Sequence, residues 1–96
     1  MDIAKAKKLI TAQKPELIRK YHIRSLGIFG SYVRGEQTKK SDLDVLVEFS
    51  KTPTLFEFIG MKNDLSDLMG LKVDLVMKSA LKKNIRPRIL REVVAV

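Results

Sequence analysis

The pattern of apolar and polar residues predicts a helix followed by a strand in the first third of the chain. Apolar positions between Ile3 and Ile18 recur near helical spacing, with lysines and arginines on the other side, which predicts an amphipathic helix. Pro15 is expected to kink or restart this helix, because proline suits a first helical turn better than an interior. Residues 23–29 are rich in branched and aromatic side chains and precede Gly30, which indicates a strand.

The central part of the chain predicts a second strand and a second helix. Residues 43–49 alternate with an apolar face, which is typical of a strand. Thr54 and Glu57 have the spacing of a capping box, so a helix is expected to begin there and to end at Gly70. The residues expected on its inner side are Leu55, Phe58, Ile59, Leu65, Leu68 and Met69.

The last part of the chain predicts a third strand and a final helix. Residues 72–77 form the strand, and residues 84–93 form an amphipathic helix with Pro87 near its start. The closing residues 93–96 are compatible with an edge strand or with a tail. This order of elements predicts an α/β fold in which a small mixed sheet is covered by helices, as a single domain over residues 1–96. The pattern leaves the strand order open.

Composition narrows the classes of protein that remain. The chain has no cysteine, which excludes disulfides and thiolate metal sites. It has no apolar run near the roughly 18 residues of a membrane span, and its basic start lacks the apolar core of a signal peptide. We therefore expect a cytoplasmic protein without a membrane partner.

The net charge of +8 is concentrated at the two ends of the chain. Residues 1–24 and residues 78–96 each carry a net charge of +5, whereas residues 25–77 carry −2. Such basic ends suit solvated helix surfaces, and they also suit nucleic acid, nucleotide phosphates or an acidic protein. The acidic centre holds the unusual residues.

Three aspartates are placed in or beside apolar strand segments. Asp42 and Asp44 are two residues apart, so they point to the same side about 7 Å apart along the backbone. Asp74 lies within the third predicted strand. If the two acidic strands are neighbours, three carboxylates meet at one sheet edge and suffice to hold two cations roughly 3.5–4 Å apart. The alternatives are a strand-entry turn for the first pair and a solvent-facing edge position for Asp74.

A small polar turn precedes the aspartates. Gly30 allows the backbone to approach a phosphate closely, and Ser31 offers a hydroxyl and an N–H at an expected helix start. Arg34, one turn later, is placed either to bind phosphate or to brace the loop. Ser41 is placed to cap or orient the carboxylate of Asp42.

The whole pattern G-S-x-x-R-G-x5-S-D-x-D is far from chance. A D-x-D pair alone is expected about 0.4 times in a chain of this composition, but the full pattern is expected on the order of once in several million. With Asp74 downstream, these residues resemble the signature of the DNA polymerase β-type nucleotidyltransferase superfamily. The closest resemblance is to its minimal nucleotidyltransferase (MNT) group, whose members consist of little but the catalytic core.

The resemblance implies a specific set of roles. Asp42 and Asp44 would bind two Mg²⁺ ions, and Asp74 would bind one of them and help to deprotonate an acceptor hydroxyl. Gly30 and Ser31 would hold the β- and γ-phosphates of a nucleoside triphosphate, with ATP as the expected substrate. The nucleotide-binding residues expected from the motif are Gly30, Ser31, Arg34 and Ser41.

The resemblance also implies a partner. MNT proteins are commonly paired with a HEPN-domain protein, often an RNase toxin, and act as the antitoxin of a type VII-like pair by transferring AMP to a HEPN tyrosine. The alternatives are an antitoxin that neutralises the toxin by binding alone and a nucleic-acid-binding basic module. We rank nucleic acid last, because the chain has no basic-aromatic pattern.

Overall fold

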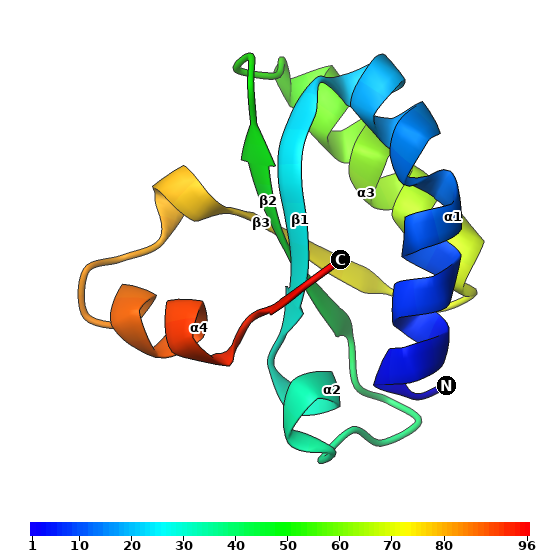
Figure 1. Cartoon of the computed structure of the whole chain (residues 1–96), viewed down its shortest axis with the longest axis vertical. Coiled ribbons are helices and arrows are strands. Elements are labelled where there is room, and N and C mark those ends of the chain that lie inside the picture. Colours follow the sequence, from blue (N-terminus) through cyan, green and yellow to red (C-terminus); the bar gives the residue numbers. More distant parts are fainter.

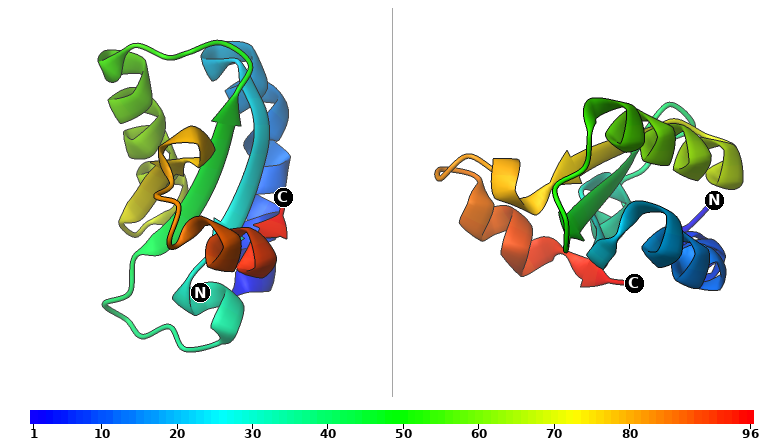
Figure 2. Two further views of the ribbon diagram at one scale, coloured as in Figure 1. Left: turned by 90° about the vertical axis from the view of Figure 1, so that its left-hand side faces the viewer. Right: turned by 90° about the horizontal axis from the view of Figure 1, so that it is seen from above.

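A four-stranded sheet lies between two helices on one face and a third helix on the other (Figure 1; Figure 2). The computed structural model describes all 96 residues. Its elements are α1 (Ile3–Tyr21), β1 (Ile23–Phe29), α2 (Ser31–Arg34), β2 (Leu43–Phe49), α3 (Leu55–Met69), β3 (Val73–Met77), the 3-10 helix η1 (Lys78–Ala80), α4 (Arg86–Glu92) and β4 (Val94–Ala95). The predicted α/β fold with a small mixed sheet is confirmed.

The strand order, which the sequence left open, is β3-β2-β1-β4. β1 is antiparallel to both of its neighbours, whereas β2 and β3 are parallel and are connected through α3. The carboxyl end of β1 therefore lies at the same edge of the sheet as the amino ends of β2 and β3. This edge is where the acidic residues of the two parallel strands come together.

α1 runs without interruption past Pro15. The Asp2 side chain caps its start by accepting the Lys5 N–H at 2.9 Å, and His22 ends it in a left-handed conformation. The predicted restart at Pro15 is wrong, because apolar residues before and after the proline are buried in the same core. Those buried residues of α1 are Ala6, Ile10, Leu17 and Tyr21. Although α1 has 19 residues, neither it nor any other helix is long and apolar enough to cross a membrane.

α3 has the predicted capping box at Thr54 and Glu57 and ends at Gly70. The predicted inner side is partly wrong, since Leu55 is 70% exposed and Ile59 is 44% exposed. The buried residues are Met61, Leu65 and Met69, which are four residues apart and so share one helix face. A residue two positions before Met61, such as Ile59, is turned roughly 200° away from that face.

The C-terminal segment closes the second face of the sheet. Ile89 of α4 packs there in a small cluster with Phe29, Leu46 and Leu81. The final residues form the edge strand β4, whose Val94 pairs with Ile28 of β1. The end of the chain is therefore part of the sheet, and it fixes Glu92, the last residue of α4 and two residues before β4, relative to the end of β1.

Candidate active site

Asp44 of β2 and Asp74 of β3 are directly paired across the two parallel strands. Parallel backbones are about 4.8 Å apart, so the two carboxylates are close neighbours. Both residues alternate with core residues such as Leu43 and Val45, which places them on the face of the sheet that carries α4. The neighbouring strands that the acidic cluster requires are therefore present.

The environment of Asp44 disfavours its charged form. Asp44 is partly buried, whereas Asp74 is exposed. Burial, together with the negative charges of Asp74 and Asp42, raises the pKa of Asp44 to about 6, and the charge of Arg34 opposes this shift. A partly buried carboxylate among other carboxylates is stabilised by a cation, so the donor set fits a hard divalent ion.

Asp42 lies just before β2 and, like Asp44, is partly buried. Its Oδ2 is 3.8 Å from Nζ of Lys72, and its side chain is 40% exposed. Exposed ion pairs of this kind contribute little to stability, so Asp42 is free to exchange its partner. No three acidic or histidine side chains form a preformed metal cage. A cation would have to draw the side chains of Asp42, Asp44 and Asp74 together.

Gly30 touches the carboxylate of Asp44. Its backbone has φ 80° and ψ −150°, a conformation that is essentially restricted to glycine. A Cβ at this position would collide with Oδ2 of Asp44. The glycine of the predicted phosphate turn is therefore required by the approach of the turn to the acidic residue, and this contact brings the two parts of the motif together.

Glu92, a residue for which the sequence predicted no role, also lies at this site. Its Oε2 accepts the N–H of Gly30 at 3.0 Å, and its Oε1 accepts an N–H of Arg34 at 2.5 Å. Burial by itself would raise the pKa of Glu92, but the hydrogen bonds from Arg34 and Gly30 outweigh it and lower the pKa. Its only signal in the sequence is that it is the single acid in the basic segment 78–96.

Arg34 and the two serines have different surroundings. Arg34 is the last residue of α2, three residues after Ser31, and it also pairs with Glu36 at 3.4 Å. Ser41 Oγ accepts the N–H of Thr38 at 2.9 Å, so the hydroxyl closes a local turn. No hydrogen bond joins Ser41 to the carboxylate of Asp42, so the structure gives no support to the expectation that Ser41 orients this carboxylate. A contact of Ser41 with nucleotide stays a prediction.

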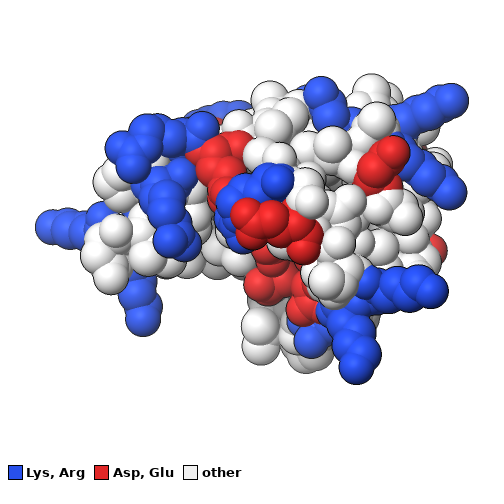
Figure 3. Space-filling view, turned by 90° about the horizontal axis from the view of Figure 1, so that it is seen from below, with Lys and Arg blue, Asp and Glu red and all other residues white.

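The electrostatic arrangement of this end of the molecule is visible in Figure 3. Acidic side chains gather in the middle of the face seen from below, and lysines and arginines border them on both sides. The basic residues that contact acidic ones here include Lys72, whose Nζ is 3.8 Å from Oδ2 of Asp42, and Arg34, which pairs with Glu92. Carboxylates surrounded by cations suit a ligand that combines metal ions with phosphate groups.

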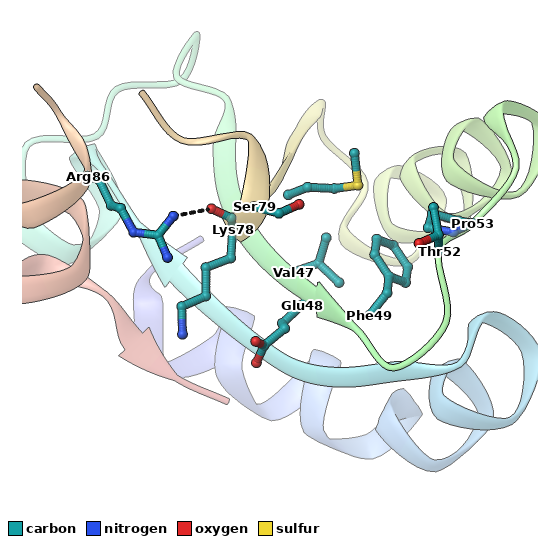
Figure 4. Close-up of a pocket in the computed structure, with 9 residues that line it drawn as sticks. Val47, Glu48, Phe49, Thr52, Pro53, Lys78, Ser79 and Arg86 are labelled. Atoms are coloured by element: carbon teal, nitrogen blue, oxygen red, sulfur yellow. Dashed lines mark hydrogen bonds between the residues drawn. The ribbon is translucent and has the colours of Figure 1, made fainter. Parts of the chain in front are cut away.

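A separate hollow of about 350 Å³ lies at the other end of the parallel strands (Figure 4). Its lining includes Glu48 and Phe49 of β2 and Lys78 of η1, and Arg86 donates a hydrogen bond to the Lys78 carbonyl at 3.1 Å. None of the predicted site residues lines it. The candidate active site is instead an open surface at the opposite edge of the sheet.

Comparisons with known proteins find a family whose model matches the chain and a relative that is similar over most of its length. The model of the nucleotidyltransferase domain family matches residues 10–96. The chain is 51% identical, over 92% of its length and 89% of the relative's length, to the protein adenylyltransferase MntA of Thermococcus cleftensis.

Two solved structures have the same fold. One, described provisionally as a minimal nucleotidyltransferase, is 32% identical, with a TM-score of 0.79 over 100% of this chain and 97% of the other. The second is a complex of the tri-AMPylated HEPN toxin of Shewanella oneidensis with its MNT antitoxin. It is 18% identical, with a TM-score of 0.66 over 93% of this chain and 70% of the other. At that identity the second likeness concerns the fold alone.

Proposed function

The chain belongs to the nucleotidyltransferase domain family as a minimal nucleotidyltransferase of the protein adenylyltransferase type, and we propose that it transfers AMP from ATP to a tyrosine hydroxyl of a HEPN-domain toxin. The observation that carries the proposal is the contact of Gly30 with Asp44, beside Asp74. This contact brings a phosphate-binding turn and a pair of carboxylates to one place.

The residues of the chain divide the reaction between them. In this proposal the N–H of Gly30 and the guanidinium of Arg34 bind phosphate oxygens, and Ser31 follows Gly30 directly in α2. Asp42, Asp44 and Asp74 are the residues that fit Mg²⁺, which when bound would neutralise charge on the phosphates and carboxylates. The carboxylates and the turn thus fix the triphosphate relative to the strand that carries Asp74.

In this proposal Asp74 acts on the acceptor. It is the exposed member of the pair, so a hydroxyl of a second protein can reach it from solvent. In the proposed step the acceptor oxygen forms a bond to the α-phosphorus, the bond from that phosphorus to the bridging oxygen breaks, and pyrophosphate leaves. The proton of the hydroxyl passes to Asp74. The open site suits a large acceptor that brings its own surface to the reaction.

Incubation with α-labelled ATP, Mg²⁺ and a HEPN-domain protein from the same genome tests this function. We expect label on the HEPN protein and a mass increase of one AMP on a tyrosine-containing peptide. Wild-type protein that transfers no label, or that transfers it without added divalent cation, would contradict the proposal. Label on a serine or threonine would support AMP transfer but contradict tyrosine as the acceptor.

Neutralisation of the toxin by binding alone is the second candidate function. The observation that favours it is an exposed apolar surface at the start of α3, where Phe56 is 87% exposed beside Leu55 and Ile59. An antitoxin that acts by occupancy must be present at the concentration of the toxin, whereas an enzyme acts at a lower one. Titration of toxin activity against this chain, with and without ATP, separates the two mechanisms.

Divalent-cation binding should depend on pH through Asp44. A proton and a cation compete for this carboxyl group, whose pKa is raised to about 6. Between pH 7.5 and pH 5 the ionised fraction falls, so we expect affinity for Mn²⁺ or Mg²⁺ to weaken about tenfold. Calorimetric titration at the two pH values measures this change. Equal affinities at both pH values would show that Asp44 is not a ligand.

A further inference from the structure

The carboxylate of Glu92 is hydrogen-bonded to both groups that are proposed to bind phosphate. Its two carboxylate oxygens accept the N–H of Gly30 at 3.0 Å and an N–H of Arg34 at 2.5 Å. A carboxylate is planar and singly charged, and it takes the same donors that a phosphate oxygen takes. Glu92 is therefore bound where the proposed function requires the triphosphate of ATP.

The backbone of Glu92 is held in place from both sides. On one side α4 packs on the sheet through Ile89, which is 6% exposed. On the other side β4 pairs with β1, and the N–H of Val96 donates to the Leu26 carbonyl at 3.0 Å. Lys14 Nζ also donates to the backbone oxygen of Val96 at 2.7 Å. The side chain of Glu92 is thus the part that can move without unpacking the C-terminal segment.

The carboxylate of Glu92 is repelled by a nearby acidic residue in its present position, and a second basic residue lies within its reach. In its present place the carboxylate adds negative charge beside Asp44, and this charge acts on Asp44. Arg88 lies four residues earlier on α4, so its side chain is on the same side of the helix as Glu92. Arg88 also exerts an attractive charge interaction on Glu92. A carboxylate that leaves Gly30 therefore has a cation nearby.

We propose that Glu92 is an internal competitor of the nucleotide, which closes the phosphate site in the free protein and must swing away before ATP binds. This proposal rests on the proposed function, because it assumes that Gly30 and Arg34 bind phosphate. The same exchange runs in reverse after transfer, when the carboxylate returns to its two donors and displaces pyrophosphate. Glu92 thus sets the affinity for the triphosphate and the release of the product.

The alternative role of Glu92 is purely structural, as a brace for Arg34. The two roles have opposite consequences for binding. A brace that is removed leaves Arg34 less ordered and weakens nucleotide binding. If Glu92 competes with the nucleotide, its removal increases the affinity by one over the fraction of molecules in which the site is open. A site that is open in one tenth of the molecules therefore gains about tenfold in affinity.

The experiment compares the wild-type protein with Glu92→Gln, Glu92→Ala and a matched control, Glu36→Gln. Glu36 also pairs with Arg34, but it makes no bond to Gly30. The control therefore removes one negative charge near Arg34 without opening the backbone donor. The probes are ATP and inorganic triphosphate with Mg²⁺ by calorimetry, and pyrophosphate as an inhibitor of transfer. Thermal unfolding of each variant verifies the fold.

We expect both Glu92 variants to bind ATP and triphosphate about tenfold more tightly and pyrophosphate to inhibit them at correspondingly lower concentration. Glu36→Gln should change these constants by less than about twofold. If the wild type binds triphosphate and both Glu92 variants bind it equally well or more weakly, Glu92 is not a competitor of the nucleotide. The proposed function is unaffected by that result. Absence of triphosphate binding in the wild type and in both variants overturns the phosphate site itself.

Discussion

Replacing Asp44 with asparagine should abolish AMP transfer and at the same time stabilise the metal-free protein above pH 6. Asn keeps the size of the side chain but loses the charge that a divalent ion needs, so we expect transfer to fall about 1000-fold or more. The stability effect has the opposite sign because Asp44 is ionised at a place that disfavours its charge. Its pKa is raised to about 6 by burial and by Asp74 and Asp42.

The pH window of this stability effect follows from the direction of the shift. A carboxyl group with a raised pKa in the folded state stabilises that state fully below its unfolded value near 3.8, and the contribution is lost as the pH rises through about 6. Wild type and Asp44→Asn should therefore unfold alike at pH 3.5. Above pH 6 the variant should be more stable by about 1 kcal/mol, after allowance for solvent screening.

Chemical denaturation at several pH values, combined with the transfer assay, measures both effects. Addition of Mg²⁺ should stabilise the wild type and have a smaller effect on the variant. Asp67→Asn is a matched control, because Asp67 is an aspartate of α3 that lines a hollow with Glu16 and Leu17 of α1. Transfer by Asp44→Asn at the wild-type rate would remove Asp44 from the catalytic machinery. Lower stability of the variant at pH 8 would contradict the account of its burial.

Most of the secondary structure follows from local signals in the sequence. β1 and β2 have the predicted bounds, and Thr54 with Glu57 forms the predicted capping box. These features depend on residues a few positions apart, so the sequence contains them in full. The uninterrupted course of α1 through Pro15 could not be predicted from local signals, because it depends on burial against a sheet formed by later residues.

The residues of the candidate site could be predicted where they belong to a sequence motif. They could not be predicted where their position depends on the pairing of strands. Gly30, Asp44 and Asp74 could be identified, but their convergence requires the parallel register of β2 and β3. Glu92 reaches the site only because β4 joins the edge of β1, and two residues of strand give almost no pattern. The local turn in which Ser41 Oγ accepts the Thr38 N–H was not predicted, because nothing in the motif specifies it.

Replacing Gly30 with alanine should have the largest effect on folding and function together. The new methyl group would meet Oδ2 of Asp44, and the backbone conformation of Gly30 is essentially closed to other residues. We expect a loss of about 3 kcal/mol in the free energy of unfolding. Gly35→Ala is the control, because Gly35 also has a positive φ (69°) but no atom within 4 Å of a new Cβ. It should cost about 1 kcal/mol.

A double-mutant cycle with Asp44→Ala separates the two causes of the Gly30 effect. Removal of the Asp44 carboxylate takes away the atom that the new methyl group would strike, whereas the cost of the backbone conformation remains. Gly30→Ala should therefore cost about 1 kcal/mol less in the Asp44→Ala background than in the wild type, as measured by urea denaturation. Equal costs in both backgrounds would mean that Gly30 is needed for its backbone alone. A smaller cost in the double variant would show that glycine is required because the phosphate turn and the acidic strand are in direct contact.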